Sequence, residues 1–575
     1  MDVEDFREDR GLLRELLSHR AFRRNVPTLF LASLSINGLS LALPLVLMQV
    51  YDRIIPTQAM STLTWLGVMF GAALCVETVL RLCRSTVSNW MASRFDHFVS
   101  SSCVDTWLRS DLVDFERDGV GMHMDQLSAV GALRNFFAGQ AFQMLMDLPF
   151  VLLFIGVIHF LGGGLLSIFV TCVMLVYALA AVMVKAGYGR RRESQKTLNE
   201  RRYNFLVEAL GGIHTVKSLT AEEQMLRRHE SLQADMAGNN FHTSFNGMLP
   251  ANMGTLFSHI TLFGVLLVGG FEVIAGQMTL GALAACSILG GRALQPVQNF
   301  AAFVVRHADI RIARDRISRS AQLQEDAPED APSLPAEIEG RVTFDNVSFR
   351  YGNDADWIFE DMNLDIKPGE MVCIAGAEGS GTSTTLSLAM GVARPSKGRI
   401  LVDGEYDLAE YGRQNLKGRM EYVTQDNVLF NGSIYDNITM FNDLDRERAH
   451  DAAALMGLED IVSELPQGFE TQVGQRLYEF LPSGIIQRIC LARALTVRPR
   501  VLILDKVTES MDSESERILL WLLAKLKGKC TILAATSSEA IIDLSDRFYR
   551  LRQGQFTQVD ASMRRTAQAK KGGAA

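Results

Sequence analysis

Long apolar stretches separated by polar connections dominate the first half of the chain. A helix needs about 20 mostly apolar residues to cross the hydrocarbon core of a bilayer. Six stretches approach that length, namely Val26–Val50, Ser61–Leu82, Phe142–Phe160, Leu165–Lys185, Leu249–Ile274 and Leu280–Val304. Short connections alternate with two long polar ones, at residues 83–141 and 186–248. The pattern predicts an α-helical transmembrane domain of six spans, made of hairpins whose long connections lie on one side.

Basic residues mark one end of these spans. They precede the first span and follow the second and the fourth, as Arg20, Arg23, Arg24, Arg81, Arg84, Lys185, Arg190, Arg191 and Arg192. The short connections at the other end carry only Arg53. Because Lys and Arg are enriched on the cytoplasmic side of membrane proteins, both termini and both long connections are expected in the cytoplasm.

The second half has the pattern of a soluble α/β domain. A polar linker, Gln322–Pro335, precedes short apolar runs at Val342–Phe344 and Val347–Phe349, which predict strands. A further apolar strand, Met371–Ala375, runs into the glycine-rich turn Gly376–Thr384, and a helix-like run follows over Thr385–Met390. A strand, a glycine-rich turn and a helix in this order form a phosphate-binding loop, because backbone N–H groups converge on the anion at the helix N-terminus. The alternative is a glycine turn without a ligand.

These patterns define the expected organisation of the chain. We predict a cytoplasmic N-terminal segment (1–25), a six-helix transmembrane domain (26–318), a linker (319–338), an α/β P-loop nucleotide-binding domain (339–560) and a C-terminal tail (561–575). The first 25 residues lack the apolar core of a secretory signal, and we expect no N-terminal peptidase domain in so short a segment.

Composition narrows the class of protein. At 575 residues and 48% apolar content the chain is too long for one ordinary domain and too apolar for a disordered protein. The net charge of -8, with no basic block beyond the membrane flanks, argues against a nucleic-acid partner. Eight scattered cysteines suit neither zinc nor a disulfide framework and indicate a reducing compartment: Cys75, Cys83, Cys103, Cys172, Cys286, Cys373, Cys490 and Cys530.

Three ionisable residues fall inside predicted spans, where such residues are candidates for function. They are Glu77, His159 and His259. Each is a candidate for substrate contact. Alternatively, Glu77 and His159 are solvated near span ends, and His259 makes a hydrogen bond between helices.

Further motifs follow in a fixed order along the chain. In the first half they are Leu43-Pro44-Leu45, Val50-Tyr51-Asp52-Arg53, Leu206-Val207-Glu208, Gly212–Lys217, Gly276, Thr279–Leu283 and Arg292–Pro296. In the second half they are Tyr351, Gln425, Leu465–Gly474, Arg488–Leu495 and Val501–Asp505. From about Val26 to Val559 the chain resembles a type I secretion exporter of the ATP-binding cassette superfamily, in the branch without an N-terminal peptidase domain.

The resemblance implies ATP and Mg²⁺ as ligands and assigns their residues. Tyr351 takes the place of the aromatic residue that stacks on adenine, and Gln425 that of the Q-loop glutamine. The phosphate loop supplies Gly376, Gly379, Ser380, Gly381, Thr382, Ser383 and Thr384. Ser383, Gln425 and Asp505 are the expected metal-binding residues. Nucleotide binding that is weak or absent is the alternative.

Four positions depart from the pattern needed for hydrolysis. Thr382 replaces the phosphate-binding lysine, Lys506 replaces the glutamate that polarises water, and Ser537 replaces the switch histidine. The signature reads Leu481-Pro482-Ser483-Gly484-Ile485, where Pro482 has no N–H to donate. We therefore expect no catalytic residue at these positions and a hydrolysis-deficient domain. Lys506 either replaces part of the charge lost at Thr382 or points to solvent.

The resemblance also implies partners and a location. The leading hypothesis is a half-transporter in the bacterial inner membrane, paired with a more complete half and exporting a polypeptide through a periplasmic adaptor and an outer-membrane channel. A second hypothesis is a non-catalytic scaffold, receptor or regulatory subunit with the exporter fold. A third is a homodimeric ATPase that uses unusual residues.

Overall fold

The computed structural model describes residues 20–138, 140–320, 323, 332, 335, 337–352, 355–411, 413–425, 427–442, 446–474, 481–552 and 554–559. Apart from Arg109–Asp114, which is grouped with the second unit, the chain divides after Leu323 into two compact units, one helical and one with sheets. Residues 1–19 of the expected N-terminal segment, much of the linker and the tail 561–575 lie outside the described residues.

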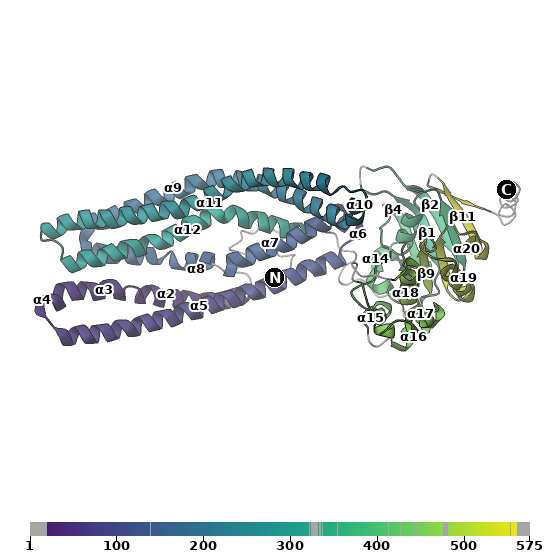
Figure 1. The fold of residues 1–575 in the computed structure, drawn as a ribbon, viewed down its shortest axis with the longest axis horizontal. Helices are drawn as coiled ribbons and strands as arrows, with labels where there is room; N and C mark the ends of the chain where they lie inside the picture. Colours follow the sequence, from purple (N-terminus) through teal and green to yellow (C-terminus); the bar gives the residue numbers. More distant parts are fainter. Residues whose placement is uncertain are drawn as a thin grey trace. The chain divides into compact units, whose positions relative to one another are not determined.

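Long helices make up the first unit, as Figure 1 shows. They are α2 (Arg20–Leu39), α3 (Ala42–Gln49), the π-helical turn η2 (Val50–Ile54), α4 (Ile55–Thr57), α5 (Met60–Arg109), α6 (Leu112–Asp118), α7 (Val120–Ala138), α8 (Gln140–Asp147), α9 (Phe150–Gly211), α10 (Ile213–Ser218), α11 (Glu222–Ile274) and α12 (Leu280–Ser320). The predicted helical transmembrane architecture is confirmed.

Five helical segments are long and apolar enough to cross a membrane. Within the described residues they are Asn25–Thr57, Met60–Arg109, Phe150–Val184, Glu222–Ile274 and Leu280–Val304. The third and fourth predicted spans share α9, which is interrupted at Gly163 with φ 74° and ψ -179°. A glycine accepts this positive φ without steric cost. The count of six spans stays a prediction.

Two predicted boundaries need correction. Phe142–Phe160 is not one helix, because α8 ends at Asp147 and α9 begins at Phe150. Pro149 lies in the break; it has no N–H to donate and disfavours helical backbone at the residue before it. The expected connection Tyr51–Met60 is largely helical, since η2 and α4 continue α3 as far as Thr57.

Two apolar cores stabilise the helical unit. Helices α9, α11 and α12 run side by side in Figure 1 and share one core, with Phe154, Leu166, Val265 and Leu289 among its buried side chains. A second core joins α5, α7 and the end of α12. Many large apolar side chains of α5 and α11 remain exposed, as the lipid-facing side of a membrane helix requires.

The second unit is built on two main sheets. Its strands are β1 (Val342–Phe349), β2 (Phe359–Ile366), β3 (Met371–Gly376), β4 (Lys397–Val402), β5 (Tyr406–Asp407), β6 (Met420–Val423), β7 (Gly432–Ser433), β8 (Gln472–Val473), β9 (Val501–Asp505), β10 (Thr531–Ala535), β11 (Arg547–Arg552) and β12 (Gln555–Gln558). One sheet has the order β2-β1-β4-β5 and the other the order β12-β11-β3-β10-β9-β6. Strands β11, β3, β10, β9 and β6 are parallel, so their carboxyl ends share one edge.

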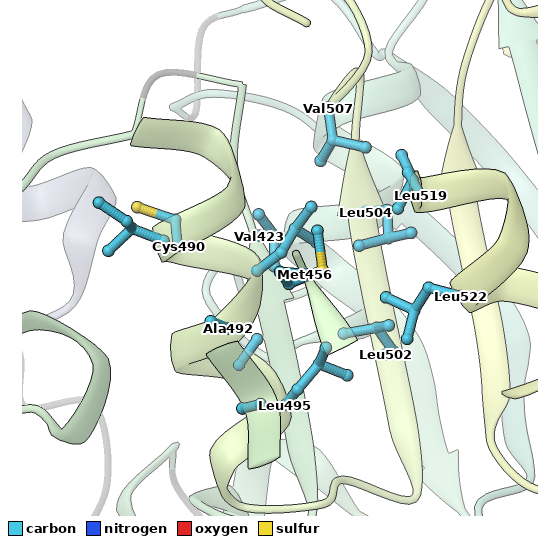
Figure 2. Packing of buried hydrophobic residues seen from close by; sticks show 14 of the residues in the cluster. Val423, Met456, Cys490, Ala492, Leu495, Leu502, Leu504, Val507, Leu519 and Leu522 are labelled. Atoms are coloured by element: carbon cyan, nitrogen blue, oxygen red, sulfur yellow. The ribbon is translucent and has the colours of Figure 1, made fainter. Parts of the chain in front are cut away.

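Helices cover these sheets and connect their strands. They are α13 (Thr382–Ala389), α14 (Leu408–Tyr411), η3 (Arg413–Leu416), α15 (Ile434–Thr439), α16 (Arg446–Leu455), α17 (Leu458–Ser463), η5 (Gly468–Glu470), α18 (Ser483–Thr496), α19 (Ser513–Leu526) and α20 (Glu539–Leu544). The core between α18, α19 and the large sheet includes Leu495, Leu502, Leu504 and Leu522 (Figure 2). This core fixes β9, whose last residue is Asp505, between β10 and β6.

One pair of predicted strands is a single strand. The two short runs around Asn346 both belong to β1, which has an irregular register between Phe344 and Val347. Asn346 has φ 51°, a left-handed conformation that asparagine tolerates better than most residues. The polar residues at this bulge explain why the sequence pattern looked interrupted.

Candidate nucleotide-binding site

The glycine-rich turn forms a phosphate-binding loop between β3 and α13. Gly379 and Gly381 have φ 76° and 95°. A Cβ on Gly381 would lie 2.6 Å from the ring of Phe359, so only glycine fits. The first turn of α13 then presents N–H groups without helical partners, which is the arrangement that binds phosphate.

Ser380 supports the same interpretation. Its Oγ is buried and has no hydrogen-bond partner within the structure as described. A buried hydroxyl without a partner is costly, and a phosphate oxygen at the loop would satisfy it. The loop therefore fits an anion such as the phosphate group of a nucleotide.

The charges of the loop are unusual for such a site. Thr382 is the first residue of α13 and is 9% exposed, so a short neutral side chain stands where a lysine was expected. Glu378 is exposed in the loop and adds a negative charge. Glu378 was not among the predicted site residues, although its position within the glycine-rich turn was a sufficient signal.

Asp505 lies at the carboxyl end of β9 and is 5% exposed. Ser383 donates its Oγ to Asp505 Oδ1 at 3.2 Å, and Tyr422 donates its Oη to Asp505 Oδ2 at 3.1 Å. Burial, and then the nearby Asp505 carboxylate, raises the pKa of Tyr422, so its hydroxyl stays a proton donor. The structure brings two of the three predicted metal-binding residues together and adds Tyr422, which sequence reasoning missed.

The third predicted metal-binding residue has a different partner. Gln425 donates its Nε2 to Glu509 Oε2 at 2.9 Å. A carboxylate without its proton only accepts hydrogen bonds, so this contact turns the amide oxygen of Gln425 away from Glu509. An amide oxygen is the atom that a hard cation binds. Glu509 is the second acidic residue near the site that sequence reasoning did not single out.

Tyr351 lies beside the phosphate loop. Its Oη is 3.1 Å from Thr384 Oγ1, and its ring meets Phe349 edge-on with ring centroids 4.9 Å apart. The residue is 51% exposed. A partly exposed aromatic ring next to a phosphate loop is suited to stacking on a planar base.

Two of the four residues that depart from the expected pattern follow strands of the large sheet. Lys506 directly follows β9 in a left-handed conformation with φ 46°, and its N–H donates to the carbonyl of Ala535 at 2.8 Å. Ser537 lies just beyond β10 and is exposed. Both residues therefore lie near the carboxyl edge of the sheet, where Asp505 also lies.

The signature segment begins α18. Pro482 is the N-cap residue and makes no capping hydrogen bond with its side chain. Ser483 donates its Oγ to the carbonyl of Ser510 at 3.0 Å, and Ile485 is half-buried. No hydrogen bond within the described part of the chain joins residues 481–485 to the phosphate loop.

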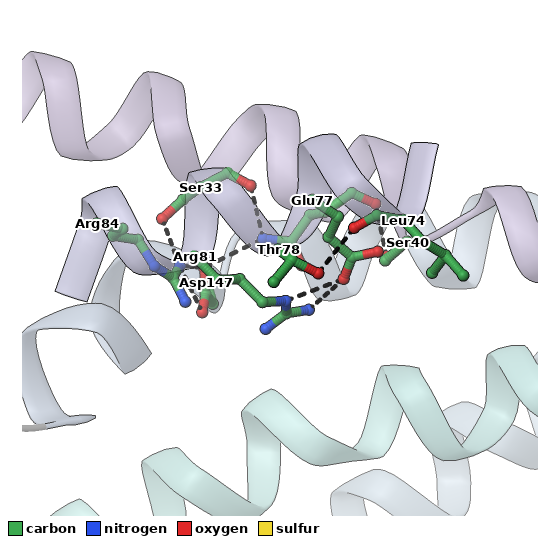
Figure 3. A network of polar contacts seen from close by, with 9 residues as sticks. Ser33, Ser40, Leu74, Glu77, Thr78, Arg81, Arg84 and Asp147 are labelled. Atoms are coloured by element: carbon green, nitrogen blue, oxygen red, sulfur yellow. Dashed lines mark hydrogen bonds and ion pairs between the residues drawn. The ribbon is translucent and has the colours of Figure 1, made fainter. Parts of the chain in front are cut away.

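The candidates in the membrane helices have partners of their own. Glu77 is bound by Arg81 at 2.6 Å, as Figure 3 shows, and His159 Nδ1 lies 3.1 Å from Ser167 Oγ. His259 is exposed, and its role stays a prediction. Glu77 thus pairs with a residue one helical turn away, whereas the contact of His159 spans the break of α9 at Gly163.

Figure 3 also shows a network that sequence reasoning missed. Arg84 of α5 donates to Asp147 Oδ1 of α8 at 3.0 Å and to Ser33 Oγ of α2 at 2.9 Å. Asn37 of α2 donates to the same Asp147 oxygen at 3.1 Å. The network joins three helices through polar side chains within an otherwise apolar bundle.

The motif that contains Asp52 contacts the motif Thr279–Leu283 near the start of α12. Asp52, in η2, accepts from Thr279 Oγ1 at 2.6 Å and from the N–H of Gly281 at 2.8 Å. A Cβ on Gly281 would lie 2.5 Å from the Asp52 carboxylate. The carboxylate thus caps the N-terminus of α12, where a negative charge is stabilised by the helix dipole.

Comparison with known families agrees with both units. A family model described as the ABC transporter transmembrane region matches residues 26–290, and one described as ABC transporter matches residues 359–509. A solved structure of a bacterial Atm1-family ABC exporter with ATP bound aligns with a TM-score of 0.81 and 23% identity, covering 96% of this chain and 98% of that one. At this identity, the match shows the fold.

Curated relatives are similar over most of their length. The cyclolysin secretion/processing ATP-binding protein CyaB of Bordetella pertussis is 31% identical over 542 residues, which are 94% of this chain and 75% of the relative. The exotoxin translocation ATP-binding protein PaxB of Pasteurella aerogenes is 30% identical over 538 residues, with 93% and 75% covered. The alpha-hemolysin translocation ATP-binding protein HlyB of Escherichia coli O157:H7 is 29% identical over 516 residues, with 89% and 72% covered.

These findings define a multi-span membrane exporter whose membrane unit and nucleotide-binding unit lie in one chain. The chain belongs to the ABC transporter family, and its relatives are type I secretion exporters. In this family the nucleotide-binding domain binds ATP with Mg²⁺.

Proposed function

We propose that this chain is a catalytically degenerate half of a type I secretion exporter, which holds nucleotide with little or no turnover and pairs with a competent half. The supporting observation is the contrast within one site. The phosphate loop, Ser383 and Asp505 form a connected cluster, whereas Thr382, Lys506, Ser537 and Pro482 replace the groups that hydrolysis needs.

The nucleotide would be held by this chain's own residues. The backbone of residues 376–384 and the Ser380 hydroxyl contact phosphate, and the Tyr351 ring stacks on the base. Ser383, Gln425 and Asp505 hold the Mg²⁺, which supplies positive charge to the phosphates when it is bound. Lys506 follows Asp505 directly and replaces part of the charge that Thr382 lacks.

The transport role rests on the relatives. The relatives named above carry cyclolysin, exotoxin and alpha-hemolysin in their names, so a polypeptide cargo is proposed here. A periplasmic adaptor and an outer-membrane channel complete the proposed path. The inner membrane is the proposed location, with the nucleotide-binding unit and both termini in the cytoplasm.

Two measurements test this function. The subunit composition of the purified membrane complex should show a second, different half-transporter; a complex containing only this chain contradicts the pairing. Single cysteines placed at Gln58 and Gly276 should react with an impermeant reagent from outside and one placed at Gly238 should not. The reverse pattern overturns the orientation.

Nucleotide binding has its own test. Tyr351→Ala should weaken binding of a fluorescent ATP analogue about 2- to 10-fold, because an aromatic contact contributes about 0.5–1.5 kcal/mol. Tyr351→Phe keeps the ring and serves as the matched control. Equal binding by Tyr351→Ala and the parent chain would show that Tyr351 does not stack on the base.

One observation favours a second candidate, a homodimeric ATPase with unusual residues. Glu509 places a carboxylate at hydrogen-bond distance from Gln425. It is three residues after Lys506, which stands where a glutamate was expected. If Glu509 acts as a general base, the purified chain alone hydrolyses ATP and Glu509→Gln abolishes this activity. Absence of turnover by the chain alone excludes this candidate.

A further inference from the structure

A cleft on the nucleotide-binding unit lies at the opposite sheet edge from the phosphate loop. Its volume is about 800 Å³, and α16, α19, the end of α18 and the start of β9 contribute its walls. Arg500 and Leu502 line it at the amino end of β9, whereas Asp505 ends that strand. Because β3, β10 and β9 are parallel, the phosphate loop after β3 lies at the other edge.

The floor of the cleft is apolar and firmly packed. Leu495 and Leu502 belong to the main core of the unit, in which Figure 2 shows them. Burial raises the pKa of the Cys530 thiol to about 12, so this side chain is neutral and acts as an apolar surface. Trp521, which is 54% exposed, adds an aromatic wall. The floor is thus preformed and suited to an apolar group.

The rim of the cleft is positively charged. Its charged lining residues are the cations Arg448, Arg498, Arg500 and Lys529 and the carboxylate Asp451. Arg498 and Asp451 form an ion pair at 3.1 Å, with side chains 72% and 68% exposed. Exposed pairs of this kind contribute little to stability, so an incoming anion can compete for Arg498.

We propose that this cleft binds a small anionic amphiphile, with one aliphatic or aromatic body and a carboxylate, sulfonate or phosphate group. The volume lies in the range of ligand pockets, which combine apolar walls with a few polar groups. Guanidinium and ammonium groups donate hydrogen bonds only, so they recognise an anion. A second nucleotide fits less well, because its base and ribose donate hydrogen bonds and Asp451 is the single carboxylate among the lining side chains.

None of the lining residues belongs to a described helix that is long and apolar enough to cross a membrane, so the proposed ligand is a free single-chain molecule from the aqueous phase. A bilayer phospholipid carries the same anionic chemistry, so the two sources must be separated by experiment. The site does not rest on the proposed transport function, since it uses none of the residues around the phosphate loop.

Photolabelling of the full chain tests the proposal. The chain is placed in nanodiscs of zwitterionic phosphatidylcholine and exposed to a fatty acid with a diazirine on its chain. Mass spectrometry should find the label on peptides that contain residues 448–455 and 521–530. Arg500→Gln with Lys529→Gln should reduce this labelling about tenfold, from the loss of two charge contacts.

Two further variants separate charge recognition from loss of folding. Lys525→Gln removes a cation that lies 4.8 Å from the Trp521 ring but does not line the cleft, and labelling should stay unchanged. Trp521→Ala keeps the cationic rim and removes the wall, so labelling should fall. Each variant is first checked for an unchanged thermal unfolding profile.

Three results overturn the proposal. One is labelling confined to the membrane helices, and another is cleft labelling that persists in the Arg500→Gln, Lys529→Gln variant. The third is cleft labelling by a photoreactive phosphatidylglycerol in the nanodisc without labelling by the free acid, which assigns the site to a bilayer lipid.

Discussion

Asp147 in the helical unit and Asp505 in the nucleotide-binding unit are both held by several donors, but the donors differ in kind. Asp147 accepts from the Arg84 guanidinium and from the Asn37 amide. Asp505 accepts from two hydroxyls, those of Ser383 and Tyr422, and the described residues pair it with no cation. The first carboxylate already has a counter-charge inside the protein, whereas the second has none among the described residues and is the one proposed above to bind Mg²⁺.

The difference separates structural groups from binding groups. An ion pair inside a bundle costs desolvation but fixes which helices meet. A carboxylate held only by neutral hydroxyls keeps its net negative charge, which is what attracts a hard metal ion. Under the proposed function, the groups expected at positions 382, 506, 537 and 482 would act mainly on the reacting phosphate. None of the four residues present there, all within the described part of the chain, contributes a hydrogen bond to the Asp505 carboxylate, so the Asp505 cluster forms without the expected groups.

The largest expected effect concerns turnover. The purified chain should release phosphate from ATP at background rate. Lys506→Glu alone should not rescue turnover, because Thr382 still leaves the phosphates without a lysine and Pro482 still alters the signature. Joint Thr382→Lys, Lys506→Glu, Ser537→His and Pro482→Ser should raise the rate measurably, since such groups act as a unit. Strong Mg²⁺-dependent turnover by the unmodified chain, abolished by Asp505→Ala, would contradict the degenerate interpretation.

Breaking the Arg84–Asp147 ion pair should cause the largest loss of stability among these variants. Asp147→Ala leaves the Arg84 side chain, which is 9% exposed, without its counter-charge. We expect a loss of about 3 kcal/mol or more, seen as a lower unfolding temperature in detergent. Glu223→Ala breaks the Arg227–Glu223 pair, whose side chains are 74% and 76% exposed, and should change little. Equal shifts for the two variants would mean that the Arg84 network has no structural role.

Removing the Asp505 carboxylate should weaken Mg²⁺-dependent nucleotide binding but should hardly change the stability of the fold. Asp505→Asn keeps the size of the side chain and one accepting oxygen, and its amide NH₂ can donate to the second hydroxyl oxygen, so the unfolding temperature without nucleotide should stay close to that of the parent chain. The Mg²⁺ enhancement of nucleotide affinity should fall about tenfold or more, because a metal ligand is lost. Titrations with and without Mg²⁺ measure this ratio, and an unchanged ratio would exclude Asp505 from the metal site.

The smallest effect should come from the residue that positions Asp505. Tyr422→Phe removes one hydrogen bond to the carboxylate and keeps the buried ring, so the Mg²⁺-dependent affinity should change about threefold. Tyr435→Phe is the matched control, since its Oη donates to the carbonyl of Arg446 and not to Asp505. If both variants give the same affinity ratio, Tyr422 does not position Asp505.

The sequence by itself determined the features that depend on neighbours along the chain. Apolar length predicted the membrane helices, and strand β9 was predicted with its observed bounds, Val501–Asp505. The phosphate loop was also visible, because its glycines and the following helix are adjacent in sequence. Hydrophobic periodicity and turn chemistry are local properties, so a single sequence carries them.

Only the tertiary structure decided which distant side chains meet. Tyr422 and Asp505 are 83 residues apart in sequence, Gln425 and Glu509 are 84 apart, and Arg84 and Asp147 are 63 apart. The order of strands β9 and β6 in the sheet, and the break at Pro149 before α9, bring these groups to hydrogen-bond distance. Such contacts depend on how whole elements pack, and no local pattern in the sequence specifies that packing.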